Sequence, residues 1–198
     1  MLDRFKKYFI LLIYITISAC NTAESELVIP STYRSQSWQL ASQESFSTQN
    51  GIWTQIPNNS GSLSLMDKVV NDSLETIRQL YKEFSIERYS FTTQDNCEIK
   101  FDSVDDVFSV NFTLEDHYLI IEDSLIGKFS DDYNNLVECL AISSKIFHDS
   151  SNIYSVVDFL PCNIKDPKSI YEVLKKPISN YTLDTISVAF INVIYEKQ

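Results

Sequence analysis

Few residues of this 198-residue chain carry side chains suited to catalysis or metal binding. The two histidines, His117 and His148, have no second histidine or cysteine at the short spacings of zinc sites. The run "HDSS", His148 to Ser151, contains the residue types of hydrolase triads, but triad members are brought together by the fold and not by adjacency. We interpret this run as a turn. The sequence therefore predicts no catalytic residue, no metal ligand and no enzymatic activity.

Binding loops for phosphate or calcium are also not indicated. The chain has three glycines, Gly51, Gly61 and Gly127, which are too few and too scattered for a glycine-rich phosphate loop. The acidic runs at 102–106 and 131–132 lack the alternating ligand spacing of a calcium loop, so we interpret them as solvated turns. We expect no cofactor.

One cysteine, Cys20, stands at the end of an N-terminal segment with a distinct layout. Arg4, Lys6 and Lys7 form a basic start, and residues 8–18 form an uncharged, mostly apolar run. This layout is typical of a secretory signal. The run is too short to cross a membrane, because a spanning helix needs about 20 apolar residues.

The residues that lead into this cysteine, Ile17-Ser18-Ala19-Cys20, resemble the lipobox of bacterial lipoproteins. In that family the cysteine thiol takes a diacylglyceryl group, the chain is cut before it, and the new amino terminus is often acylated with a fatty acid such as palmitate. The resemblance implies a cleaved signal peptide over residues 1–19 and a membrane anchor at Cys20. Two or more buried acyl chains anchor a protein stably. Because Asn21 and not aspartate follows, the resemblance implies a lipid-anchored protein of the cell envelope, on the outer membrane, facing the periplasm or the cell surface.

The chain is strongly acidic, with a formal net charge of −11. Residues 1–19 contribute +2, from Arg4, Lys6 and Lys7 against Asp3, so the rest of the chain carries −13. Nucleic-acid affinity comes largely from basic residues that neutralise phosphates, so we expect no nucleic-acid partner. The same charge disfavours a protein face that lies flat on anionic lipid.

Composition divides the mature chain into two parts. Residues 20–50 are rich in Ser, Thr, Gln and Glu, which predicts a mostly disordered tether. The lipobox resemblance implies that this tether is lipidated at Cys20. Residues 51–198 have enough apolar and aromatic residues for one core and predict a single globular domain.

Periodicity predicts an α+β domain. A short strand is expected at 51–57, and apolar residues at three- and four-residue steps predict one long N-terminal helix over 62–84. Alternation from residue 86 to 122 predicts an antiparallel meander. Residues 131–147 fit a helix or a strand, and we favour a strand paired with 153–161. A short helix over 167–176 and a closing strand over 183–197 complete the expected elements.

A three-residue match adds a second resemblance. Gly51 and Trp53, in "GIW" at the start of the first expected strand, resemble the Gly-x-Trp signature of lipocalins. This resemblance implies a curved antiparallel sheet or barrel, with these two residues marking a ligand-binding sheet. The alternative interpretation of Trp53 is an ordinary core aromatic residue at a strand start.

Three cysteines remain besides the anchor: Cys97, Cys139 and Cys162. In an oxidising compartment, one disulfide and one free thiol is the natural count. A Cys139–Cys162 bridge would join neighbours in a hairpin, whereas a bridge from Cys97 would close a longer loop. The sequence leaves these pairings open, and three buried thiols are the alternative.

Two functional hypotheses follow, both for a non-enzymatic binding protein held on the membrane by Cys20. In one, a lipocalin-like sheet carries an apolar small molecule. In the other, the acidic surface docks a basic protein partner, as an immunity or inhibitor lipoprotein would, with fast and salt-sensitive association. A closed barrel with an apolar interior cavity would favour the first, and a filled core with an acidic outer groove would favour the second.

Overall fold

The fold was analysed in a computed structural model, which describes residues 26–49, 51–57, 85–149, 152–176 and 182–198. About 69% of these residues are in strands. The strands are β1 (Ser31–Gln49), β2 (Ile52–Ile56), β3 (Ile86–Phe91), β4 (Asn96–Phe101), β5 (Val107–Glu115), β6 (Tyr118–Ile121), β7 (Ser124–Phe129), β8 (Asn135–His148), β9 (Ile153–Cys162) and β10 (Thr182–Lys197). A 3₁₀ turn, η2 (Pro167–Ile170), leads directly into one helical turn, α4 (Tyr171–Leu174).

Eight of the strands close into an antiparallel barrel. Each strand from β3 to β8 pairs with the next, and β10 closes the ring by pairing with β8 on one side and β1 on the other. The ring is completed by β1, which pairs with β3 along Ser31–Arg34. Because the ring is closed, each of the eight strands is paired on both sides within the barrel.

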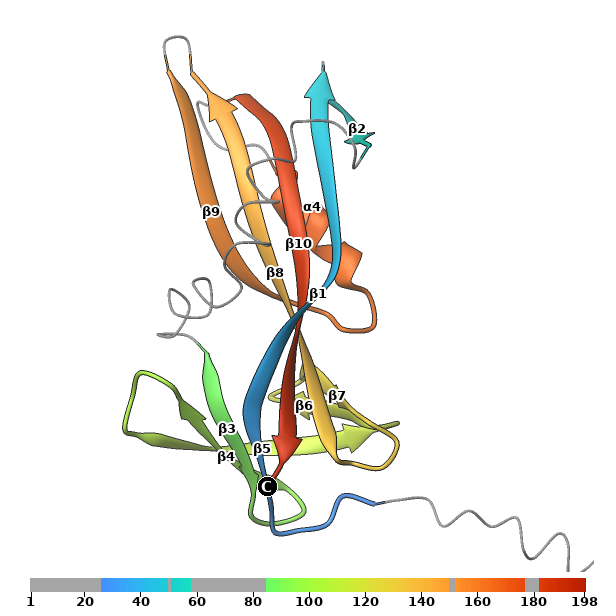
Figure 1. The fold of residues 1–198 in the computed structure, drawn as a ribbon, viewed down its shortest axis with the longest axis vertical. Helices are drawn as coiled ribbons and strands as arrows, with labels where there is room; N and C mark the ends of the chain where they lie inside the picture. Colours follow the sequence, from blue (N-terminus) through green and yellow to red (C-terminus); the bar gives the residue numbers. More distant parts are fainter. Residues whose placement is uncertain (1–25, 50, 58–84, 150–151, 177–181) are drawn as a thin grey trace, which may run out of the picture.

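Three strands are much longer than the barrel and continue into a second sheet. The pairing of β7 with β8 ends at Glu138, and the pairing of β9 with β8 begins at the next residue, Cys139. Beyond the barrel, the strands therefore lie in the order β9-β8-β10-β1-β2. Figure 1 shows β1, β8 and β10 running the length of the molecule, with β3 to β7 around one end and β9, β2 and α4 at the other. We call these two parts the barrel and the upper sheet.

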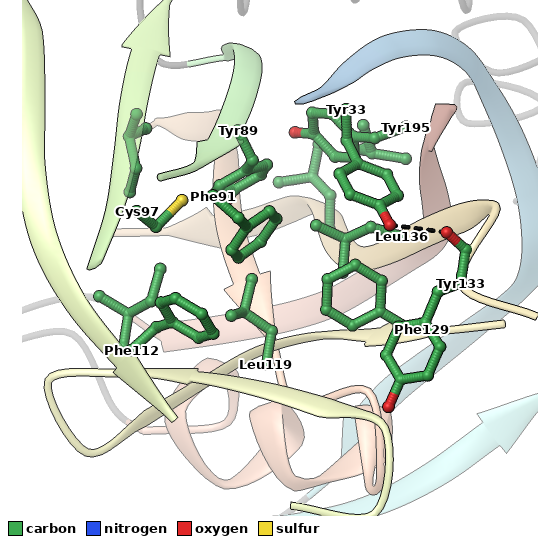
Figure 2. Packing of buried hydrophobic residues seen from close by; sticks show 14 of the residues in the cluster. Tyr33, Tyr89, Phe91, Cys97, Phe112, Leu119, Phe129, Tyr133, Leu136 and Tyr195 are labelled. Carbon is green, nitrogen blue, oxygen red and sulfur yellow. Dashed lines mark hydrogen bonds between the residues drawn. The ribbon is translucent and has the colours of Figure 1, made fainter. Parts of the chain in front are cut away.

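Strand alternation lets β8 and β10 serve two cores. Successive side chains of a strand point to opposite faces, so each long strand supplies one face to each core. On β8, Leu136, Leu140 and Ile142 belong to the barrel core, whereas Cys139 and Phe147 belong to the core beneath α4. Figure 2 shows the aromatic packing of the barrel core. Its buried members include Tyr33, Tyr89, Phe91, Phe112, Leu119, Phe129, Leu136 and Tyr195.

The short helix is fixed to the upper sheet by contacts to β1. The hydroxyl of Tyr171 donates to Oε2 of Glu44 at 3.0 Å, and Nζ of Lys168 lies 2.6 Å from Oε1 of the same carboxylate. Nζ of Lys175 lies 4.3 Å from the ring centroid of Phe46. None of the helical turns in the described ranges is long and apolar enough to cross a membrane.

The α+β class expected from the sequence is wrong. The described residues form an essentially all-β molecule, and their helical content is confined to 167–174. The long helix predicted over 62–84 lies outside the described residues. Hydrophobic periodicity is a local signal, whereas pairing between strands that are distant in the sequence leaves no such signal. The predicted helix was therefore given too much weight relative to the ten strands.

The expected tether is also corrected. Residues 31–49 form the strand β1, although their composition predicted disorder. This strand pairs with β10 from Tyr33 to Ser47, so backbone hydrogen bonds hold it where apolar side chains are sparse. A few large anchors, among them the fully buried Tyr33 and the largely buried Phe46, supply its packing. Residues 20–25 lie outside the described residues.

Most other expected elements are confirmed. The short first strand, the meander from residue 86 and the closing strand are present as β2, β3 to β6 and β10. The short helix predicted over 167–176 is present as η2–α4, which ends at Leu174. The ambiguous segment 131–147 is a turn up to residue 134 and then the strand β8, with which its predicted partner pairs as β9. The disulfide joins Cys139 to Cys162 at directly paired positions, and Cys97 is a buried free thiol.

The disulfide yields a direct prediction. The denatured chain lacking residues 1–20 should show one reactive thiol, from Cys97, and the Cys97→Ala control should show none. The double variant Cys139→Ser/Cys162→Ser should lose about 3 kcal/mol of unfolding free energy, because the bridge closes a loop with a sequence separation of 23 residues. Thiol titration and urea denaturation measure these outcomes. Three reactive thiols in the unreduced protein would contradict the bridge.

Candidate functional site

A cavity of about 250 Å³ lies at the end of the barrel that adjoins the upper sheet. Its walls come from most of the barrel strands and from the end of β9. The lining is mainly apolar, with one carboxyl and two phenol groups. Among the residues that line it are Trp38, Ile86, Ile99, Ile121, Leu140 and Val193, together with Tyr89, Tyr195 and Glu138.

The cavity lies where β8 exchanges one neighbour for another. Glu138 is the last residue of β8 that pairs with β7, and Cys139 is the first that pairs with β9. The disulfide from Cys139 to Cys162 therefore clamps the strand fork beside the cavity. The covalent link fixes β9 to β8 at the residue where β9 replaces β7 as the neighbour of β8.

Strand register places one row of residues across the site. Trp38 of β1 pairs with Val193 of β10, Val193 pairs with Glu138 of β8, and Glu138 pairs with Gly127 of β7. Residues paired directly across antiparallel strands share a face of the sheet, so this row faces the barrel interior. The carboxyl of Glu138 thus projects into the cavity from a strand of the barrel wall and not from a loop.

Gly127 leaves the room that this row needs. A Cβ atom at this position would lie 2.7 Å from the carbonyl oxygen of Val137 and 3.3 Å from Cγ of Glu138. The first distance is closer than real Cβ atoms come to a carbonyl oxygen. Glycine therefore allows β7 to approach β8 opposite the carboxyl.

Both oxygens of the Glu138 carboxyl accept hydrogen bonds from tyrosine hydroxyls. Tyr89 of β3 donates to Oε1. Tyr195 of β10 donates to Oε2 at 2.9 Å. The two tyrosines are almost fully buried, and their rings meet edge to face with centroids 5.2 Å apart. The carboxyl is held in a fixed orientation by groups from two other strands.

Burial changes the acidity of this cluster. Loss of solvation raises the pKa of Glu138 to about 7, against the lowering effect of the two tyrosine hydrogen bonds. The same loss of solvation, together with the nearby carboxyl, raises the pKa of Tyr89 well above 10. None of the described residues lining the cavity is basic. Near neutral pH the site therefore exists in both a neutral and a negatively charged form.

This arrangement is suited to binding. Ligand sites are typically concave, mostly apolar and fitted with a few oriented polar groups, with volumes of roughly 300–1,000 Å³. At about 250 Å³ the cavity is slightly smaller than that range, which indicates a small ligand. A carboxyl with a pKa near 7 is also suited to proton transfer. No histidine, lysine or free cysteine occurs among the described lining residues to act as its partner.

The residues predicted from the sequence lie elsewhere, apart from one cysteine pair. Gly51 and Trp53 belong to the β1–β2 hairpin of the upper sheet, where Trp53 packs against the core beneath α4. Cys97 is buried in the barrel core. Cys20 lies outside the described residues. Cys139 and Cys162 do line the cavity, as the disulfide.

The histidines do not form a site with one another. Nδ1 of His148 lies 2.7 Å from Oδ2 of Asp184 at the far end of the upper sheet. His117 occupies a hairpin turn and stacks on Tyr133. Asp149 accepts from the backbone N–H of Asn152, in the turn predicted for "HDSS", whose two serines lie outside the described residues. The described part of the chain contains no group of three or more residues arranged to hold a metal ion.

Sequence reasoning missed Glu138, although a signal was present. It is the only charged residue between Asp132 and Lys145, in the otherwise uncharged run "YNNLVECLAISS". A lone charge within a buried strand is costly unless it is hydrogen-bonded. Such a residue marks a functional candidate.

Comparison with protein-family models, with curated proteins and with solved structures finds no match to this chain. The function must therefore be argued from the cavity and its residues.

The raised pKa of Glu138 predicts a pH-dependent stability. The folded protein holds this proton more tightly than the unfolded chain, whose glutamate titrates near 4.5. The stabilisation is complete below about pH 4.5 and is lost as the pH rises through about 7, amounting to about 3 kcal/mol at 1.36 kcal/mol per pKa unit. Urea denaturation of wild type and Glu138→Gln from pH 4 to 8 measures it. The variant should lack this component.

The matched control is Glu98→Gln, on the face of β4 opposite the core residues Cys97 and Ile99. It should keep the wild-type dependence on pH. An identical pH profile in Glu138→Gln and wild type would show that the carboxyl titrates in the folded protein as it does in the unfolded chain.

Proposed function

We propose that this protein is a lipoprotein of the cell envelope whose barrel binds a small, mostly apolar molecule without chemically changing it. The observation that carries the proposal is the apolar cavity at the barrel end, with Glu138 fixed in its wall. The barrel is closed and the cavity lies at its end, lined mainly by barrel residues, which favours a carrier of small molecules over an acidic outer groove that docks a basic protein.

The lipid anchor completes this proposal. The resemblance of residues 17–20 to a lipobox supports attachment at Cys20, on the outer membrane. Only five residues separate the anchor from Glu26, where the described chain begins. At no more than about 3.6 Å per residue, Glu26 stays within about 20 Å of the anchor, and β1 begins five residues later. Such a carrier would work close to the bilayer and not at the end of a long tether.

Anchoring can be tested independently of binding. The variant Cys20→Ser should lose incorporation of radiolabelled palmitate and should leave the membrane fraction, because no thiol remains for the diacylglyceryl group. Cys97→Ser should retain both properties, since Cys97 is buried in the barrel. Labelling of Cys20→Ser at the wild-type level would rule out the anchor.

Binding can be tested with N-phenyl-1-naphthylamine, a neutral apolar dye that fluoresces on leaving water. The chain without residues 1–20 keeps every described element and should bind the dye saturably. Leu125→Trp, which places a large ring in the cavity lining, should weaken binding at least tenfold. Leu40→Trp is the matched control, because Leu40 lies on β1 outside the lining and is 40% exposed. It should bind as wild type does.

Salt distinguishes the two binding hypotheses. Burial of apolar surface is not screened, so dye binding should persist at 1 M salt, where the Debye length is only about 3 Å. If Leu125→Trp binds the dye like wild type, the cavity is not the site. If the protein instead captures a basic envelope protein that is released by salt, the acidic-surface hypothesis replaces this one.

A further inference from the structure

The polar groups that face the cavity offer acceptors. The hydroxyls of Tyr89 and Tyr195 already donate to Glu138, so they turn lone pairs and not protons toward a ligand. Ser85, at the edge of the lining, donates its hydroxyl to Oδ2 of Asp102 at 2.6 Å. Each oxygen of an ionised carboxyl can accept a second hydrogen bond. A ligand that satisfies this wall must bring its own hydrogen-bond donor.

The charges around the cavity also favour a ligand that carries hydrogen-bond donors. Glu138 has no basic counterpart among the described residues of the lining, and Asp102 places a second carboxylate behind Ser85. An ionised carboxyl in apolar surroundings is strongly stabilised by a cation that pairs with it. The ionised Glu138 would repel a ligand carboxylate. The charge of −13 on residues 20–198 also attracts cations toward the protein.

Aromatic rings flank the same position. Tyr89 and Tyr195 hold the carboxyl between them, and Trp38 lies in the same register row, two strands from Glu138. The faces of aromatic rings attract ammonium groups, more strongly where water is excluded. The wall therefore combines a carboxyl, acceptors and aromatic rings around one small volume.

We propose that the ligand of this cavity is a small amine, with its apolar body filling the cavity and its protonated amino group paired with Glu138. This inference rests on the proposed function and names the class of ligand. No bond is made or broken: the ammonium group donates to the carboxylate, and the proton that Glu138 carried in the empty neutral site leaves to solvent.

The proposal implies tighter binding at higher pH. The titratable groups that face Glu138 are Tyr89 of β3 and Tyr195 of β10, with the thiol of Cys97 of β4 beside Tyr89 and Asp102 behind Ser85. Burial raises the pKa of Cys97 to about 12, so this thiol keeps its proton in the neutral range. An alkylamine stays protonated there, as lysine does. Amine affinity should rise at least tenfold from pH 5 to 8 as the carboxyl ionises.

The test compares three ligands of equal chain length: octylamine, 1-octanol and octanoate. Trp38 lines the cavity, and Trp53 is the only other tryptophan. Trp53→Phe therefore leaves Trp38 fluorescence as a reporter of binding, with calorimetry as a second readout. At pH 8, octylamine should bind at least tenfold more tightly than octanol, and octanoate should bind most weakly. Octanol affinity should not rise with pH.

Variants assign the preference to one carboxyl. Glu138→Gln should reduce the amine-to-alcohol ratio to about one and remove the pH dependence, whereas Glu98→Gln should preserve both. The ligand ranking and its pH dependence in the otherwise wild-type chain do not depend on the folding of any Glu138 variant. Equal binding of octylamine and octanol overturns the amine inference and leaves the apolar carrier in place. An amine preference that survives Glu138→Gln also overturns it. Failure of all three ligands and of the dye to bind overturns the inference and the proposed function together.

Discussion

The continuous pairing of β8 with β10 is the interaction on which both parts of the molecule depend. It runs from Asn135 opposite Glu196 to His148 opposite Thr182, through the barrel and the upper sheet. Because alternate residues face opposite sides, the same two strands supply the barrel core and the core beneath α4. A shift of register by one residue would exchange the two sets of side chains and disrupt both cores at once.

The site follows from a topological consequence of that long pairing. A barrel of short strands cannot flank β8 along its whole length, so the strand must change its outer neighbour where the barrel ends. The change falls between Glu138 and Cys139. A cavity lies beside this point, and a disulfide joins the strand β9 to β8. The stability of the fork and the existence of the pocket have the same origin.

Placing a carboxyl at this fork costs stability and supplies specificity. The tyrosine hydroxyls compensate part of the lost solvation of Glu138, and the carboxyl nevertheless titrates near neutral pH. At a position that serves packing alone, a hydrophobic side chain would stabilise the fold more than a carboxyl does. Gly127 of β7 pairs directly with Glu138, and its lack of a side chain allows β7 to approach β8 at this position. β7 and β8 therefore have less apolar packing at these two positions, and one carboxyl faces an apolar cavity.

The sequence by itself determined several local features: the strands of the meander over 86–121, the closing strand, a short helix within 167–176 and the acidic charge, while it favoured the β8–β9 pairing without deciding it and did not indicate β7. These are encoded in alternation, turn residues and composition within short windows, which is why they were predictable. Only the tertiary structure decided that polar β1 is a strand, that the sheet closes, that Cys139 pairs with Cys162, and that Glu138 meets two tyrosines from β3 and β10. Each of these depends on contacts between distant segments, since backbone pairing needs no particular side chain and register alone places the carboxyl inside the barrel.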